Sequence, residues 1–291
     1  MPISASIEAT TSCNLHCPEC PSGLRKFSRP TGNIELSYFK KYVDQMYLHL
    51  TYLMIYFQGE PYLNKQFIEL VKYANSKKIY TATSTNGHFL NDENARHTVE
   101  SGLDRLIISL DGTGQESYSS YRVGGEFEKV VDGIKNVINW KNKLGSKKPY
   151  VILQFLVLKT NEHLLNEISD LSKQLGVDEL QLKTAQFYDH KNGNALMPLA
   201  AQYSRYLKNS DGTYSIKKKI RDHCLRMWQS LVITWDGRVV PCCFDKDATH
   251  QLGDLNTSSL KEIWKGKEYK DFRKKVLINR KSIDICCNCS E

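Results

Sequence analysis

Short apolar runs alternate with amphipathic segments along the first 184 residues. Six runs are rich in β-branched or aromatic residues and have the length of buried strands. Between these runs, apolar residues such as Val130, Ile134 and Val137 recur at intervals of three or four, which places them on one face of a helix. The predicted strands are 3–9, 51–57, 79–85, 105–110, 150–158 and 179–184, and the clearest helical faces are 39–50, 127–138 and 164–175.

The connections between these strands are long enough to hold a helix each. Strand and helix that alternate six times predict parallel pairing with right-handed crossovers. We therefore expect an α/β fold, a partial (β/α)6 barrel, over residues 1–184. Folds of this kind place their chemistry at the carboxyl ends of the strands.

The alternation of strand and helix stops after residue 184. Residues 185–223 are polar, contain several tyrosines and are interrupted by Gly193, Pro198 and the pair Asp211-Gly212. We expect this segment to be an irregular connector that lines the substrate pocket.

Residues 224–291 predict a small α+β module. Two apolar runs within 231–241 flank Asp236-Gly237, which predicts a tight hairpin turn with positive φ at both residues. Two helical stretches follow, near 259–265 and 269–277.

Composition and charge exclude several classes of protein. The chain has 291 residues, 41% hydrophobic and 25% charged, which are ordinary globular values. The net charge of +8 is spread along the chain except at Lys217, Lys218 and Lys219, so a nucleic-acid substrate, which needs basic residues gathered on one face, is not expected. No apolar run approaches the roughly 18 residues of a membrane span and no secretory signal precedes the first strand, so we expect a cytoplasmic protein.

The chain contains nine cysteines, and in the reducing cytosol these indicate metal binding or catalysis better than disulfides. Cys13, Cys17 and Cys20 form a C-x3-C-x2-C loop directly after the first predicted strand. Three thiolates on one loop can bind three irons of a cubane cluster and leave the fourth iron open. Zinc is the alternative, with His16 as the local fourth ligand.

This loop resembles the cluster-binding signature of the radical S-adenosylmethionine (SAM) superfamily, and its position after strand one of a (β/α) barrel agrees. Glu19 stands where the family usually has an aromatic residue before the third cysteine. The resemblance implies a 4Fe-4S cluster whose open iron binds SAM, and an external one-electron reductant of flavodoxin or ferredoxin type. SAM cleavage then gives a 5′-deoxyadenosyl radical that removes a hydrogen atom from an unactivated C–H bond.

Motifs at the ends of the next strands extend the resemblance. Gly59, Glu60 and Pro61 look like the family's GEP motif, which binds the amino group of SAM, and Arg122 follows at the spacing where related maturases bind the SAM carboxylate. Further residues that the resemblance places near SAM are Ser84, Asn86, Ser109 and Asp111. Taken singly, each motif also has a plain structural explanation, as a helix-end charge, a turn dipeptide or a surface ion pair.

The other six cysteines lie in the C-terminal module. Cys224, Cys242, Cys286 and Cys289 form two pairs that a hairpin can bring together as a four-thiolate site for zinc or a 4Fe-4S cluster, and spacing alone does not decide between the two. The segments 237–242 and 252–255 and the pair Ile263-Trp264 are similar to SPASM and twitch modules, which implies a single auxiliary 4Fe-4S cluster of the twitch type.

Two cysteines, Cys243 and Cys287, are left over from this four-thiolate set. We expect them to pack as small hydrophobic side chains. The alternatives are that they act as alternate ligands or that one of them relays a proton or hydrogen atom.

A closed four-cysteine cluster suits acceptance of one electron, so we expect a two-electron oxidation of a small alcohol, sugar or aminocyclitol-like substrate. The layout resembles 2-deoxy-scyllo-inosamine dehydrogenase, a radical SAM enzyme with one twitch cluster. The alternative is a peptide or protein maturase that performs crosslinking, epimerisation or residue oxidation. Because the first strand begins close to Met1, without room for a peptide-recognition domain before it, we expect the small substrate.

The residues that contact the substrate are the least specific part of the pattern. Candidates for the base that takes the alcohol proton are Glu8, Asp189 and His190, together with the connector tyrosines. Lys183, near the end of the sixth strand, is a candidate to reach the cavity, although lysines at strand ends more often extend to water.

Overall fold

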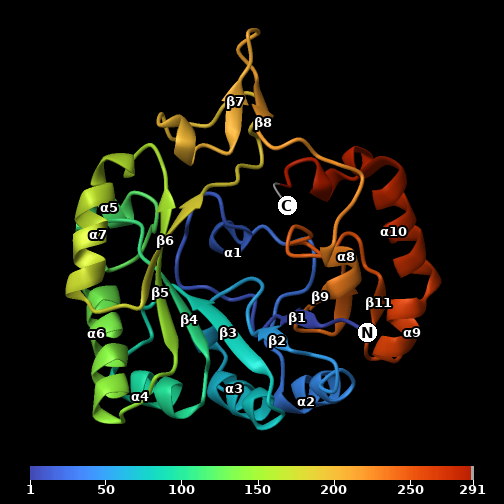
Figure 1. Ribbon diagram of the computed structural model, residues 1–291, viewed down its shortest axis with the longest axis horizontal. Coiled ribbons are helices and arrows are strands. Elements are labelled where there is room, and N and C mark those ends of the chain that lie inside the picture. The colour runs from blue at the N-terminus through green and yellow to red at the C-terminus, as the bar shows by residue number, and fades with distance from the viewer. Residues whose placement is uncertain (290–291) are drawn as a thin grey trace.

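The computed structural model describes residues 1–289, so the last two residues of the predicted module 224–291 lie outside the described part. Six parallel strands follow one another in chain order and form a curved, open sheet (Figure 1), which confirms the predicted partial barrel. These strands are β1 (Ser4–Ile7), β2 (Tyr52–Met54), β3 (Tyr80–Thr85), β4 (Arg105–Ser109), β5 (Tyr150–Val157) and β6 (Glu179–Thr184).

The sheet does not end at β1. Strand β9 (Ser230–Ile233) pairs parallel with β1, and β10 (Arg238–Val240) and β11 (Gly253–Asp254) continue antiparallel beyond it. One nine-stranded sheet therefore runs in the order β11-β10-β9-β1-β2-β3-β4-β5-β6. The C-terminal segment thus adds strands directly beside β1, the strand that leads into the first cysteine loop.

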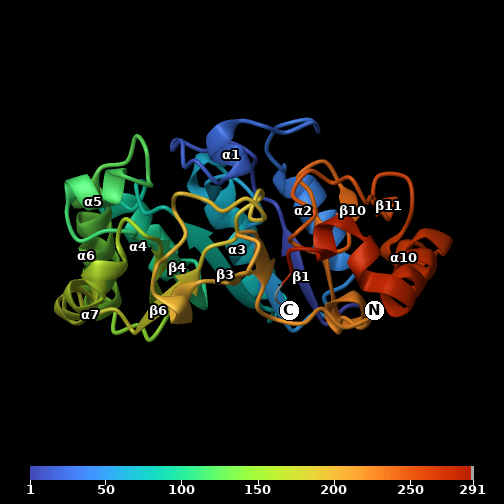
Figure 2. The ribbon, with the colours of Figure 1, turned by 90° about the horizontal axis from the view of Figure 1, so that it is seen from above.

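Helices cover the convex face of the sheet, because their apolar stripes face the strands. The main helices are α2 (Leu36–Asp44), α3 (Phe67–Ser76), α4 (Asp92–Glu100), α6 (Phe127–Lys143), α7 (Leu165–Gln174), α9 (Leu260–Lys265) and α10 (Lys267–Asn279). Shorter helices are α1 (Pro21–Leu24), α5 (Gln115–Ser119) and α8 (Arg226–Gln229), and 3-10 turns are Pro61–Leu63, Glu162–Leu164, Ala201–Tyr203, Arg280–Ser282 and Asp284–Cys286. Figure 2 shows α10 and β11 at the opposite end of the molecule from α6 and α7.

Helix α2 ends earlier than the apolar pattern predicts. The helix stops at Asp44, although the pattern continues through Met46 to Leu50. Both of these side chains are nevertheless buried in the core. The pattern therefore identified a buried face but not the end of the helix.

Strand alternation divides the barrel residues between two faces. Ile7, Leu53 and Leu106 belong to the core under the helices. Their neighbours along each strand face the concave side, where the register aligns Ser109 of β4 with Gln154 of β5 and Gln181 of β6. The concave wall of β4 to β6 therefore carries a polar row of Ser109, Gln154 and Gln181.

The predicted hairpin is present between β9 and β10, but its turn differs from the expected type. The amide of Gly237 donates to the carbonyl of Thr234 at 3.0 Å, and the amide of Thr234 donates to Arg238 at 2.9 Å. Gly237 has φ +91°, whereas Asp236 does not have positive φ. The expectation of two positive-φ residues was wrong, because the extra loop residue lets glycine alone take the left-handed conformation.

The connector is more regular than the sequence predicts. Strands β7 (Tyr206–Lys208) and β8 (Tyr214–Ile216) form a separate two-stranded antiparallel sheet across the Asp211-Gly212 turn (Figure 1). The Asp211 carboxylate accepts hydrogen bonds from the amide and hydroxyl of Thr213, and Gly212 has φ +86°.

Within residues 1–289, no helix combines the length and apolarity that a membrane span requires.

Candidate functional site

The first three cysteines lie on the loop between β1 and α1, at the carboxyl end of the strand. Cys17 is buried, and Cys13 and Cys20 are partly buried. Three N–H donors face sulfurs of this loop: the amide of Leu15 and Nδ2 of Asn86 toward Cys13 Sγ, at 3.5 and 3.9 Å, and Nη1 of Arg122 toward Cys17 Sγ, at 3.9 Å. Donors directed at cysteine sulfur fit thiolates that hold an iron-sulfur cluster.

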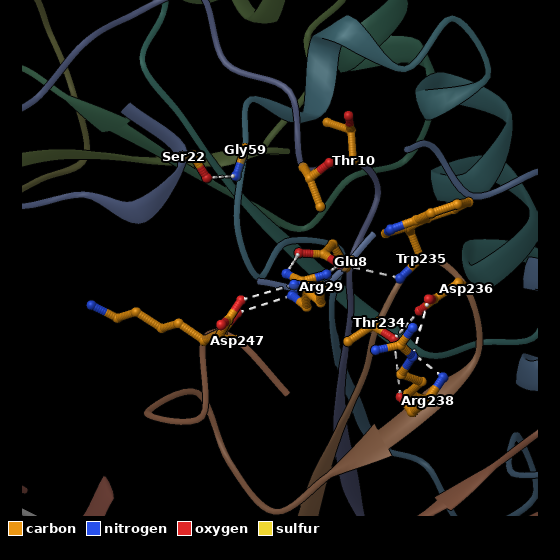
Figure 3. A network of polar contacts seen from close by, with 12 residues as sticks. Glu8, Thr10, Ser22, Arg29, Gly59, Thr234, Trp235, Asp236, Arg238 and Asp247 are labelled. Carbon is orange, nitrogen blue, oxygen red and sulfur yellow. Dashed lines mark hydrogen bonds and ion pairs between the residues drawn. The ribbon is translucent and has the colours of Figure 1, made fainter. Parts of the chain in front are cut away.

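The segment after β2 lies directly against this loop because residue 59 is glycine. Gly59 has φ +75°, and a Cβ there would come within 2.7 Å of the Ser12 carbonyl oxygen. Its amide donates to Ser22 Oγ at 2.8 Å (Figure 3), and the amide of Glu60 donates to the Ser12 carbonyl at 2.7 Å. The GEP-like motif and the cysteine loop therefore form one packed unit.

The carboxylate of Glu60 is buried beneath this unit, with 1% of the residue exposed. It accepts hydrogen bonds from Thr85 Oγ1 at 2.7 Å, the Asn86 amide at 2.7 Å and the Tyr62 amide at 3.3 Å. Burial raises the pKa of Glu60 to about 7 in spite of these donors. A buried carboxyl group of this kind is suited to bind an ammonium group.

Asp111, at the end of β4, orients Arg122. Its Oδ2 accepts from Arg122 Nε at 2.5 Å and its Oδ1 from the Leu156 amide at 2.7 Å. The Asp111 carbonyl is held in turn by Asn161 Nδ2 at 3.0 Å. The guanidinium group is thereby placed between Asp111 and Cys17, which gives Asp111 a supporting position behind Arg122.

His88 is part of this network and was not selected from the sequence. Its Nε2 accepts from the Glu126 amide at 2.9 Å, so the proton lies on Nδ1, which donates to Asn86 Oδ1 at 3.0 Å. Asn86 Nδ2 donates to Asn14 Oδ1 at 2.7 Å. The sequence feature that could have identified His88 is its position two residues after Asn86, in the same strand-end motif.

The four cysteines predicted for the auxiliary site come together around one cavity. Cys224, Cys242, Cys286 and Cys289 line it with apolar neighbours that include Met227, Phe244, Phe272 and Val276. Arg280 Nη2 lies 3.1 Å from Cys289 Sγ. Burial raises the pKa of Cys286 to about 11, so its thiol is protonated at neutral pH unless a metal displaces the proton. The four sulfurs and the apolar wall fit a closed, fully ligated cluster.

The two remaining cysteines do not pack in the core, and that expectation was wrong. Cys243 and Cys287 are both exposed, because each directly follows an inward-facing cysteine in a turn. Cys287 Sγ donates to the Lys281 carbonyl at 2.9 Å, and Cys243 Sγ accepts from Arg226 Nη1 at 3.9 Å.

Over residues 1–289, no three Cys, His, Asp or Glu side chains are arranged to bind a single metal ion.

The candidate bases lie in different surroundings. Glu8 is fully buried and forms a bidentate ion pair with Arg29. Asp189 is exposed at an outer cavity beside Glu19, whose carboxylate accepts from Asn194 Nδ2 at 2.8 Å. His190 stacks on Tyr206 with ring centroids 4.8 Å apart, and burial lowers its pKa. The structure does not bring the side chains of Glu8, Asp189 and His190 together. Lys183, the candidate at the end of the sixth strand, is an exposed residue of β6.

A cavity of about 560 Å³ lies on the concave face of β9, β1 and β2. Its lining runs from Tyr56 and Phe57, just before the GEP-like motif, to Cys242 of the auxiliary set and its neighbour Cys243. The phenol of Tyr56 lies within electrostatic reach of Cys20 and Cys13, and burial raises its pKa. Further hydroxyl-bearing residues on the wall are Ser4, Ser6, Tyr52 and Ser230. The cavity therefore extends from the neighbourhood of the first cysteine loop to the auxiliary site.

Two family models match the chain. Residues 7–144 match the radical SAM superfamily, and residues 224–290 match the SPASM iron-sulfur cluster-binding domain. These matches contain all seven cysteines assigned to the two sites.

Curated relatives and solved structures are similar over nearly the whole chain. A tungsten-containing aldehyde ferredoxin oxidoreductase cofactor-modifying protein of Pyrococcus furiosus is 26% identical, covering 98% of this chain and 86% of the relative. A PqqA peptide cyclase of Rhodopseudomonas palustris is 27% identical, covering 92% and 74%. The structure of BtrN in complex with AdoMet and 2-DOIA has a TM-score of 0.61 at 18% identity, covering 100% of this chain and 94% of that chain, which supports a common fold.

Proposed function

Because this chain is a radical SAM protein with a C-terminal SPASM domain, we propose that it oxidises its substrate by two electrons, with the auxiliary 4Fe-4S cluster as acceptor of the second electron. When bound, SAM and the reduced first cluster supply the 5′-deoxyadenosyl radical that removes the substrate hydrogen atom. The site residues hold these groups and exclude water. The observation that carries the proposal is the cavity whose wall includes both Tyr56, near the first cysteine loop, and Cys242 of the auxiliary set.

We assign the SAM-binding roles to residues that already converge in the structure. Cys13, Cys17 and Cys20 would hold the first cluster, and the buried Glu60 carboxylate would receive the ammonium group of SAM. Arg122, held by Asp111, would pair with the SAM carboxylate. Ser84, Asn86 and Ser109 end the neighbouring strands and would border the rest of the cofactor.

For the substrate, we propose a small alcohol of sugar or aminocyclitol type. The concave cavity of about 560 Å³ exceeds one such ring, and its serine and tyrosine hydroxyls suit a polyhydroxylated ligand. Loss of a hydrogen atom from the carbinol carbon, of the hydroxyl proton and of one further electron gives a ketone or aldehyde. Modification of a peptide is the second candidate, and the similarity to a PqqA peptide cyclase favours it.

Anaerobic reconstitution tests the proposal. The protein should bind about eight irons as two 4Fe-4S clusters and form 5′-deoxyadenosine only with SAM and a low-potential reductant. Aminocyclitols, sugar alcohols and short peptides are then compared for oxidised product and for 5′-deoxyadenosine above the substrate-free rate. About four irons with zinc in the remainder, or absence of 5′-deoxyadenosine, would contradict it.

A further inference from the structure

Two segments distant in sequence meet beside the first cysteine loop. We call residues 25–33, which follow α1, the clasp segment, and residues 244–249, which follow the cysteine pair at 242 and 243, the auxiliary loop. The Asp247 carboxylate accepts the amide of Ser28 at 2.9 and 3.1 Å, the hydroxyl of Ser28, and the amide of Arg29 at 3.4 Å. Figure 3 shows Asp247 directed toward Arg29 from the auxiliary loop. One carboxylate therefore holds the backbone of the clasp segment.

Arg29 continues this connection into the sheet. Its Nε donates to the Lys246 carbonyl at 3.1 Å, and its Nη1 and Nη2 donate to the two carboxylate oxygens of Glu8 at 2.8 and 2.6 Å (Figure 3). The Arg29 and Glu8 side chains are only 2% and 0% exposed. A buried bidentate pair is confined to one geometry, so Arg29 fixes the auxiliary loop to the end of β1.

The hairpin between β9 and β10 adds a third support. The amide of Trp235 donates to Glu8 Oε2 at 3.2 Å, and its Nε1 donates to the Pro30 carbonyl at 3.2 Å. A Cβ on Gly32 would come within 2.6 Å of the Trp235 ring, so glycine allows this close packing. Strand, hairpin, clasp segment and auxiliary loop are thus joined around one buried guanidinium group.

These contacts lie within a few residues of both cysteine sets. In sequence, Glu8 lies five residues before Cys13, and Asp247 lies five residues after Cys242. The guanidinium carbon of Arg29 is 5.7 Å from the ring centroid of Phe57, which lines the concave cavity. A displacement at the clasp would therefore reach the first loop, the auxiliary loop and the wall of the substrate cavity.

We propose that Arg29 and Asp247 are positioning residues that hold the loop of Cys13, Cys17 and Cys20 at a fixed place relative to the auxiliary cysteines. This inference rests on the proposed function, because only there do both sets serve one reaction. Asp247 is the point at which to test it, since its hydrogen bonds to Ser28 lie at the exposed edge of the network and their loss leaves the Glu8–Arg29 pair intact.

Hydrogen-deuterium exchange of the purified full chain tests the holding role. In Asp247→Ala, amides of residues 13–29 should exchange at least about tenfold faster than in the wild type, because the clasp segment opens locally more often. The matched control is Asp271→Ala, which removes an exposed carboxylate paired with Lys267 at 2.6 Å on α10. It should leave exchange in 13–29 unchanged. Equal protection of 13–29 in Asp247→Ala and the wild type would overturn the inference.

The distance between the clusters gives a spectroscopic readout that a merely structural role would not move. With both clusters reduced and paramagnetic, pulsed dipolar spectroscopy should give one narrow distance for the wild type and Asp271→Ala. Asp247→Ala should give a broadened or displaced distribution, and Asp247→Asn, whose amide oxygen still accepts from Ser28, should restore it in part. An unaltered distribution in Asp247→Ala counts against the clasp. Iron for a single cluster in the wild type contradicts the proposed function instead, and exchange then decides the clasp by itself.

Discussion

At the scale of single residues, the ionisation of Glu60 controls the predicted cation site. Burial raises its pKa to about 7, so a growing fraction is neutral as the pH falls below that value. A neutral carboxyl group does not pair with an ammonium group. The KM for SAM, measured through reductant-dependent 5′-deoxyadenosine formation, should therefore be constant above pH 7. Below pH 7 it should increase, approaching about tenfold for each pH unit by which the pH is lowered.

The control is Glu60→Gln, which keeps the shape and cannot ionise. Its KM for SAM should be high and independent of pH, and a flat profile in the wild type would refute the assigned role of Glu60. The same raised pKa has the opposite effect on stability: SAM binding strengthens as the pH rises, whereas the folded protein becomes less stable. Since the folded pKa lies above the usual 4.5, the folded protein without SAM loses stability as the pH rises from 4.5 to about 7.

At the scale of elements, strands and helical faces followed from local patterns, whereas long-range pairing did not. The six parallel strands were predicted because period and composition are local signals. The pairing of β9 with β1 joins residues more than two hundred positions apart, and no local pattern encodes it. The same limit explains the error at Cys243 and Cys287: the sequence gives their neighbours, but not which side of each turn faces the cavity.

Sequence motifs indicated which residues lie side by side, whereas single candidate residues outside a motif gave no indication of their partners. The cysteine loop, Gly59 and Glu60 lie together as the motifs require. Glu8 was one of the candidate bases for the alcohol proton, and the structure pairs it with Arg29. That partner lies in a segment without a recognisable motif, so the sequence could not reveal it.

The packing of the GEP-like segment on the cysteine loop gives a prediction for Gly59→Ala. Positive φ alone should destabilise the alanine variant by about 1 kcal/mol, and overlap with the Ser12 carbonyl should add to this and displace the segment. We expect a lowered unfolding midpoint and a several-fold loss of 5′-deoxyadenosine formation. Gly212→Ala is the control, because Gly212 has φ +86° with no atom within 4 Å of the added Cβ. Equal effects of both substitutions would argue against this packing.

At the scale of the whole molecule, one sheet carries both cysteine sets, since β1 leads into the first loop and its neighbour β9 lies between Cys224 and Cys242. The two sets should nevertheless fail in different ways. Replacing Cys13, Cys17 and Cys20 together by alanine should abolish 5′-deoxyadenosine formation, because no cluster remains to bind SAM. This variant should keep about four irons.

Replacing Cys286 by alanine should remove about four irons and stop formation of oxidised product, while reductant-dependent SAM cleavage continues at the first cluster. Cleavage continues because the first loop takes its donors from Arg122, Asn86 and Leu15, all outside the auxiliary module. Cys287→Ala is the matched control, since this exposed neighbour should change neither iron content nor product. Iron, 5′-deoxyadenosine and product are measured on the same preparations. Undiminished product from Cys286→Ala would mean that the auxiliary site is structural, and that the second electron leaves the substrate by another path.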